Sequence, residues 1–292
     1  MSVPAVKILL TDGSSGLGAM LTKALEAESF DLYVVGESEL AWDEPEIFLD
    51  LLKTYQPDFV INNAGWASAP TEAEQQILLA AAKTVASGCA LTKIIPIHLS
   101  SYRVFGADHK ASYAEFDSPV PVTDAGRAYQ QAEEYFSEAI EHWLCLRMAW
   151  VLGSWPGNTL TNLLGALVGG ETLTVNQAYP GAPTTDHDIA RILVSVIRQV
   201  SCGAQNWGVF HYCSGDDCSQ AEFATAVASI LEQDGVLNGQ VDIVDREPGE
   251  GEAGSAVLSC RRIGDNFGVQ ARSWRQGLHT MIKLWLRENG YN

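Results

Sequence analysis

The stretch that decides the fold is VKILLTDGSSGLG at residues 6–18. Its first five residues form a mostly apolar, partly β-branched run, which is typical of a buried parallel strand. A glycine- and serine-rich turn follows, and apolar residues then recur at helical spacing over residues 19–25. In such a strand–turn–helix unit, the glycines let backbone N–H groups approach a pyrophosphate at the positive end of the helix. The stretch therefore predicts a dinucleotide-binding fold.

The rest of the chain continues the alternation of strands and helices. Apolar runs predict further strands at residues 32–35, 58–61, 93–99, 143–148 and 209–212. Helical spacing predicts helices at residues 44–55, 73–86, 160–168, 185–200, 220–233 and 274–289. This alternation predicts an α/β fold with a Rossmann-type, doubly wound parallel sheet. We expect residues 1–150 to form the dinucleotide-binding domain, and residues 151–292 to form a smaller C-terminal α/β substrate lobe interleaved with the last elements of that domain.

The composition limits the classes of partner. The chain has 292 residues, of which 47% are hydrophobic, so it can bury a sizeable core. Its 36 acidic and 18 basic residues give a formal net charge of −18. Such a surface repels nucleic acid and anionic membranes, and we expect neither as a partner. An anionic small molecule would need a local basic pocket.

The cysteine pattern and the hydropathy indicate the compartment. None of the six cysteines forms a CxxC pair or a zinc-type spacing, so we expect no metal site and a reduced, cytoplasmic protein. There is no run of 18 apolar residues that would suggest a membrane span. The first expected strand begins almost at once, which leaves no room for a signal peptide.

Candidate cofactor-binding groups follow the expected strand ends, because doubly wound sheets bind ligands at the carboxyl ends of their strands. They are Thr11, Gly13, Gly16, Leu17, Gly18, Glu37, Asn63, Ala64 and Gly65. Glu37 would accept the adenosine ribose hydroxyls and disfavour a 2′-phosphate, which favours NAD over NADP; an exposed loop acid is the alternative. Asp12 places a carboxylate at the mouth of the turn, where it opposes a pyrophosphate. The turn alone leaves both NAD(P) binding and its loss open.

Several motifs together resemble one family. The turn TDGSSGLG is similar to the TGxxxGxG turn of the short-chain dehydrogenases/reductases, with Asp12 at its first glycine. Three further motifs are LSSYRVF at 99–105, RMAWVLG at 147–153 and GAPT at 181–184. They are similar to LSTDYVF, RxSWVYG and GxPT of the dTDP-4-dehydrorhamnose reductase-like group of extended short-chain dehydrogenases. The resemblance runs from residue 6 to about residue 285, and it implies an NAD(P)-dependent oxidoreductase family that acts on nucleotide sugars.

The resemblance also locates the family's catalytic helix at residues 121–133. In the family, a tyrosine on this helix exchanges a proton with the substrate carbonyl, and a lysine four residues later assists it. The tyrosine position is Ala125 here, and the lysine position is Tyr129. Ser101 falls on the family's Ser/Thr position and keeps its hydroxyl. Tyr102 and Tyr129 are weaker candidates for a rearranged catalytic site.

The second lobe is implied to contact the nucleotide sugar. The candidate substrate-binding residues are Trp150, Gly181, Ala182, Pro183, Thr184 and Arg261. Arg261 would offset phosphate charge, or it would be an ordinary surface residue. Trp155 would stack on a base or sugar, or it would pack as a wedge beside Pro156.

Two classes of function follow. The replaced tyrosine and lysine, together with Asp12, favour a regulatory member that has lost hydride transfer and binds a small molecule, such as a nucleotide sugar, or a partner protein. The alternative is an active NAD(P)-dependent reductase of a nucleotide-sugar ketone with a rearranged site. A ligand sensor and a homodimer also stay open, because fold alone does not decide function.

Overall fold

The computed structural model describes residues 5–14, 16–36, 39–106, 108, 110–237, 242–247 and 254–291. Its centre is a six-stranded parallel sheet in the order β2-β1-β3-β4-β5-β9. The strands are β1 (Lys7–Thr11), β2 (Asp31–Val35), β3 (Phe59–Asn62), β4 (Ile95–Ser101), β5 (Leu144–Met148) and β9 (Gly208–Tyr212). The strand order reverses between β1 and β3, so the ligand crevice of this fold lies at their carboxyl ends. The predicted α/β class and Rossmann-type sheet are confirmed.

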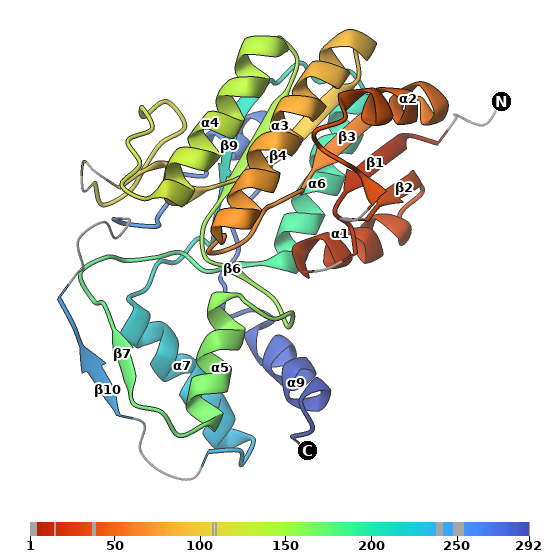
Figure 1. Ribbon diagram of the computed structural model, residues 1–292. Coiled ribbons are helices and arrows are strands. Elements are labelled where there is room, and N and C mark those ends of the chain that lie inside the picture. The colour runs from red at the N-terminus through yellow and green to blue at the C-terminus, as the bar shows by residue number, and fades with distance from the viewer. Residues whose placement is uncertain are drawn as a thin grey trace.

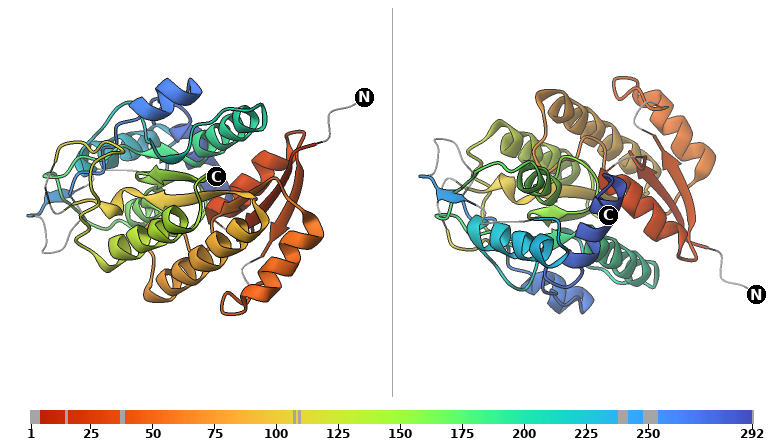
Figure 2. Two further views of the ribbon diagram at one scale, coloured as in Figure 1. Left: turned by 90° about the horizontal axis from the view of Figure 1, so that it is seen from above. Right: turned by 90° about the horizontal axis from the view of Figure 1, so that it is seen from below.

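Helices cover both faces of the sheet (Figure 2). One face carries α2 (Pro45–Tyr55), α3 (Glu72–Thr92) and α4 (Asp124–Ala139). The other face carries α1 (Gly16–Glu26), α6 (Asp186–Ser201) and α8 (Arg261–Phe267). Each layer buries its own apolar side chains against the β-branched and leucine-rich strands, as expected for a sheet that is covered twice.

A second lobe lies beyond the carboxyl edge of the sheet (Figure 1). Its helices are α5 (Thr159–Val168), α7 (Gln220–Gln233) and α9 (Leu278–Glu288). Two short parallel pairs complete it: β6 (Val151–Leu152) with β8 (Thr184–Thr185), and β7 (Leu173–Val175) with β10 (Ile243–Asp245). This lobe has its own core, which includes Leu160, Leu164, Phe223, Trp274 and Ile282.

Some element boundaries differ from the expectations for identifiable reasons. The last helix begins at Leu278, not at Trp274, because Gly277 takes a left-handed backbone with φ of 90°. Helix α3 extends past the expected end at residue 86 to Thr92, and Gly88 within it lets the ring of Phe48 approach closely. Residues 248–253, within the glycine- and glutamate-rich stretch at residues 245–255, lie outside the described residues. Among the described helices, none combines the length and the apolar character that crossing a bilayer demands.

A buried ion pair joins helix α4 to the middle of the sheet. Arg147 on β5 donates from Nε to Glu133 Oε1 at 2.8 Å and from its terminal nitrogen to Oε2 at 2.6 Å. The hydroxyl of Ser100 on β4 donates to the same carboxylate at 2.5 Å. Arg147 also lies 3.4 Å from Nε2 of His211 on β9, and burial lowers the pKa of His211 to about 3. The pair therefore fixes α4 against three neighbouring strands.

Removing one partner of this pair leaves a charge buried without compensation. We expect Glu133→Gln to lower the free energy of unfolding by about 3 kcal/mol, since broken buried pairs typically lose 3–5 kcal/mol. Urea unfolding measures the change. The matched control is Glu134→Gln, which alters an exposed carboxylate on the next residue and should stay within about 0.5 kcal/mol of wild type. Equal stability of the two variants would contradict the structural role of the pair.

Candidate functional site

The ends of β1 and β3 are tied together at the crevice. The Thr11 hydroxyl accepts backbone N–H groups from Asn63 at 3.0 Å and Ala64 at 3.2 Å, and it donates to Asn62 Oδ1 at 3.0 Å. The side-chain amide of Asn63 donates to the carbonyl of Asp12 at 3.0 Å. Thr11 and Asn63 are both candidate cofactor-binding residues. Their hydrogen bonds join the end of β1 to the end of β3 and so set the width of the crevice.

The glycines of the turn mostly serve the turn itself. A Cβ on Gly18 would lie 1.8 Å from the carbonyl oxygen of Asp12, and one on Gly13 would lie 2.4 Å from Cγ1 of Val34. Gly16 starts α1 with φ of 51°, and Asp12 takes φ of 50°, a left-handed value that favours glycine.

The other candidate cofactor-binding residues around the turn have packing roles or are not described. Leu17 and Ala64 are buried, Gly65 packs against the backbone of α3, and Glu37 lies outside the described residues.

Two tryptophans meet over this turn. The six-membered ring of Trp155, from the loop between β6 and α5, lies 3.6 Å from the position of a Cβ on Gly16. Its ring packs edge-on against Trp66, with ring centroids 6.4 Å apart, and its Nε1 donates to Asp186 Oδ2 at 3.3 Å. Trp66 in turn donates from Nε1 to the carbonyl of Ser100 at 3.3 Å. An indole therefore covers the helix N-terminus at which a dinucleotide of this fold places its pyrophosphate.

A cleft of about 390 Å³ lies between the sheet and the second lobe. Its walls come from the ends of β4 and β5, from α5 and β7, and from α7. The lining residues are Trp66, Ser68, Ser101, Tyr102, Arg103, Met148, Trp150, Val151, Thr159, Asn162, Leu163, Ala166, Leu173, Thr174, Val175, Gln220, Phe223 and Ala224. Among these described residues, Arg103 carries the only charge at neutral pH, and none is a carboxylate. The cleft is therefore mostly apolar with one cationic group.

Three consecutive residues form the sheet side of the cleft. Ser101 ends β4, and its hydroxyl accepts the N–H of Arg103 at 3.3 Å, which caps the short helix η2 (Tyr102–Val104). Arg103 donates from Nε to the carbonyl of Ser68 at 2.9 Å, and its guanidinium lies 5.5 Å from the ring centre of Tyr102. The structure thus brings Ser101 and Tyr102 together at the cleft, with Arg103 beside them.

Tyr129 does not join them. It is fully buried on α4, and its hydroxyl donates to the carbonyl of Ala67 at 2.8 Å and accepts the N–H of Ala67 at 3.1 Å. Burial raises the pKa of this phenol above its ordinary value of 10. The Tyr129 hydroxyl is therefore hydrogen-bonded to the backbone of Ala67 both as donor and as acceptor, and Tyr129 does not line the cleft. Ala125 lies in the first turn of α4, where its methyl group has no proton to donate.

The motif at residues 181–184 shapes the opposite wall. A Cβ on Gly181 would lie 2.1 Å from the indole of Trp150, so only glycine allows this approach. Thr184 donates its N–H to the carbonyl of Trp150 at 3.0 Å, while Ala182 and Pro183 are buried beside it. Of the candidate substrate-binding residues, Trp150 lines the cleft, and residues 181–184 hold it there.

Arg261, the remaining candidate substrate-binding residue, does not line the cleft. It starts α8, on the face of the sheet that also carries α1 and α6. Its side chain is 88% exposed and forms an ion pair with Asp265 at 3.5 Å. Among the described lining residues, Arg103 is the cation of the cleft. The sequence did show Arg103 just past Ser101, but no local pattern distinguishes it from Arg261.

The sequence analysis did not identify Trp66 as a site residue. Nothing in the residues around it indicates that it contacts Trp155, which lies 89 positions later.

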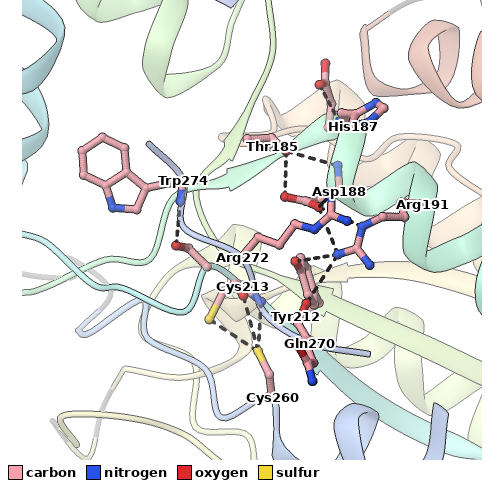
Figure 3. Close-up of polar contacts among 12 residues, drawn as sticks. Thr185, His187, Asp188, Arg191, Tyr212, Cys213, Cys260, Gln270, Arg272 and Trp274 are labelled. Atoms are coloured by element: carbon pink, nitrogen blue, oxygen red, sulfur yellow. Dashed lines mark hydrogen bonds and ion pairs between the residues drawn. The ribbon is translucent and has the colours of Figure 1, made fainter. Parts of the chain in front are cut away.

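Helix α6 begins at a polar junction close to the crevice (Figure 3). Thr185 accepts the N–H of Asp188 at 3.1 Å, and Asp188 binds Arg191 at 3.0 Å. Arg191 reaches the hydroxyl of Tyr212 at 3.3 Å. This junction fixes Asp186, whose carboxylate accepts the indole N–H of Trp155 and the N–H of His187. Among the described residues, no group of three or more His, Cys, Asp or Glu side chains is arranged to hold a metal ion.

Comparison with known proteins identifies the family of this chain. The model of the RmlD substrate binding domain matches residues 6–286. The chain belongs to this family. It is 24% identical over 284 residues to spore coat polysaccharide biosynthesis protein SpsK of Bacillus subtilis, with 95% of this chain and 97% of that protein covered. It is 26% identical over 297 residues to dTDP-4-dehydrorhamnose reductase of Burkholderia thailandensis, with 95% and 98% covered.

Solved structures of similar proteins share the fold. The dTDP-4-dehydrorhamnose reductase of Bacillus anthracis in complex with NADP has a TM-score of 0.84 at 19% identity, with 97% of this chain and 100% of that chain covered. The enzyme WbmG of Bordetella bronchiseptica in complex with NAD and UDP has a TM-score of 0.80 at 17% identity, with 99% and 97% covered. Of these two proteins with the same fold, one was solved with bound NADP and the other with bound NAD and UDP.

The buried carboxyl of Asp186 makes stability depend on pH. Burial raises the pKa of Asp186 from 3.8 to about 6, so the folded state holds this proton more tightly than the unfolded state does. The resulting stabilisation is full below 3.8 and is lost as the pH rises through 6. Between about pH 7.5 and pH 5, wild type should gain roughly 1 kcal/mol of unfolding free energy relative to Asp186→Asn. Urea unfolding at both pH values tests this, and parallel curves for the two proteins would refute it.

Proposed function

We propose that the cleft between the lobes binds a nucleotide sugar through its diphosphate. The observation that carries this proposal is the charge of the cleft. Among the described residues that line it, Arg103 is the only charged one and none is a carboxylate, although the chain has a net charge of −18. Because an acidic surface repels an anionic ligand, a carboxylate-free pocket with one guanidinium is the kind of local environment that such a ligand requires.

The remaining walls suit the other parts of such a ligand. Trp66, Tyr102 and Trp150 offer aromatic faces on which a base or a sugar ring stacks. Asn162 and Gln220 offer amides for sugar hydroxyls. Two similar proteins support this ligand class, since the name of the Burkholderia thailandensis relative specifies a dTDP sugar and the WbmG structure contains UDP.

Reduction of a ketone on that sugar is one candidate for the chemistry, and the names of the relatives favour it over a loss of hydride transfer. In this chain, Ser101 and Tyr102 are the hydroxyl groups at the sheet side of the cleft. A nicotinamide would supply the hydride, and Glu37 favours NAD over NADP as its source. For such a cofactor to bind, Trp155 would have to leave the glycine turn.

Binding without reduction is the second candidate, in which the chain acts as a regulatory member. The family's proton donor and lysine positions hold Ala125 and Tyr129, and the hydroxyl of Tyr129 is bound to Ala67. Of the family's three catalytic positions, only that of Ser101 keeps the residue type found in the family. Both candidates share the nucleotide-sugar ligand and differ only in whether a hydride is transferred.

Arg103 provides the test of the ligand. We expect Arg103→Gln to weaken the binding of dTDP and UDP about tenfold in calorimetric titration, because one charge-assisted hydrogen bond is lost. Arg261→Gln removes the same charge from an exposed position on α8, and its affinity should stay within about twofold of wild type. Equal effects of the two substitutions would exclude a specific diphosphate site in the cleft.

The two candidate chemistries are separated by an assay of nicotinamide oxidation with a dTDP-linked 4-ketosugar and either NADH or NADPH. A reductase that draws its proton from the cleft shows turnover, and Tyr102→Phe lowers that turnover about a hundredfold, the typical contribution of a general acid. A binding protein shows no turnover while the calorimetric titration still reports the sugar nucleotide. Turnover that Tyr102→Phe leaves unchanged would exclude Tyr102 as the donor.

A further inference from the structure

The loop between β6 and α5 holds Trp155 firmly in place. The side-chain amide of Asn158 donates to the carbonyl of Gly153 at 3.0 Å and also binds the carbonyl of Trp155. The hydroxyl of Thr161 donates to that same carbonyl at 3.2 Å. The loop is thereby anchored to the first turn of α5, whose N-terminus Asn158 caps.

The indole itself is held from three sides. A Cβ on Gly153 would lie 2.1 Å from Nε1 of Trp155, so the loop is shaped around the ring. Asp186 accepts its N–H, and Trp66 packs against its edge. The ring of Trp155 is packed and its N–H is hydrogen-bonded, so specific contacts hold the indole in its position over Gly16.

The surface under the indole is the start of α1. Backbone N–H groups there point outward at the positive end of the helix, which is the part of this fold that receives a pyrophosphate. We propose that Trp155 is the resident occupant of the dinucleotide crevice, and that any dinucleotide must displace its indole from Gly16 in order to bind. Trp155 then sets dinucleotide affinity, whereas the nucleotide-sugar cleft stays accessible without this movement.

The expected effect follows from the population of the displaced state. Apparent affinity is the intrinsic affinity multiplied by the fraction of molecules that are competent to bind. A minor state populated at roughly 1–10% lowers affinity by about a hundredfold to tenfold. Removing the indole should therefore raise the dinucleotide affinity by the same factor, without any new contact to the ligand.

Calorimetric titration of the full chain with NADH and with NADPH tests this proposal. We expect Trp155→Ala to bind at least one of them about tenfold to a hundredfold more tightly than wild type. Trp155→Leu keeps an apolar side chain against Trp66 and serves as the second variant if the alanine protein does not fold. The control is Trp285→Ala, which removes another partly exposed indole, on α9 beside Tyr291, and should leave affinity unchanged.

The proposal is overturned if wild type binds a dinucleotide as tightly as the Trp155 variants do. It is overturned as well if no folded variant binds either dinucleotide, because a barrier other than the indole would then be responsible. Neither result depends on the nucleotide sugar, since titration with dTDP and UDP is measured separately on the same proteins. Tighter binding by a Trp155 variant, with Trp285→Ala like wild type, supports the proposal.

Discussion

A carboxylate and a guanidinium that leave water together must satisfy each other, and Glu133 and Arg147 do so in the middle of this molecule. Their pair joins α4 to β5, and Ser100 and His211 extend it to β4 and β9. Because it fixes a helix against three strands, it also fixes the carboxyl ends of those strands. The cleft starts at the ends of β4 and β5, so its geometry depends on an ion pair that does not itself line the cleft.

Two further contacts hold α4 in place. Gly126 brings the start of the helix against the carbonyl of Arg103, where a Cβ would lie only 2.2 Å away. Tyr129 then holds the segment after β3 through the backbone of Ala67. The helix thus supports Arg103 on one side and residues 66–68 on the other. In this chain α4 thus positions residues that line the cleft without lining the cleft itself.

Local patterns made most of the fold predictable. The stretch at residues 6–18 and the alternation of apolar runs specify strands, helices and their parallel pairing, because these depend on short-range periodicity and on a fixed crossover hand. The positions of Ser101, Tyr102 and Trp150 at the cleft also followed from motifs. The meeting of Trp66 with Trp155 did not, since two residues 89 positions apart meet only through tertiary packing. The same holds for Arg103, which sequence alone could not rank above Arg261.

The burial of Tyr129 limits which side chains residue 129 accepts. A lysine at this position would place an ammonium group in a fully buried site and would leave the N–H of Ala67 without its acceptor. A single substitution to lysine would therefore lower the stability of the fold, because the backbone of Ala67 is hydrogen-bonded to the phenol in both directions. The surroundings of residue 129 thus favour a phenol over a charged side chain.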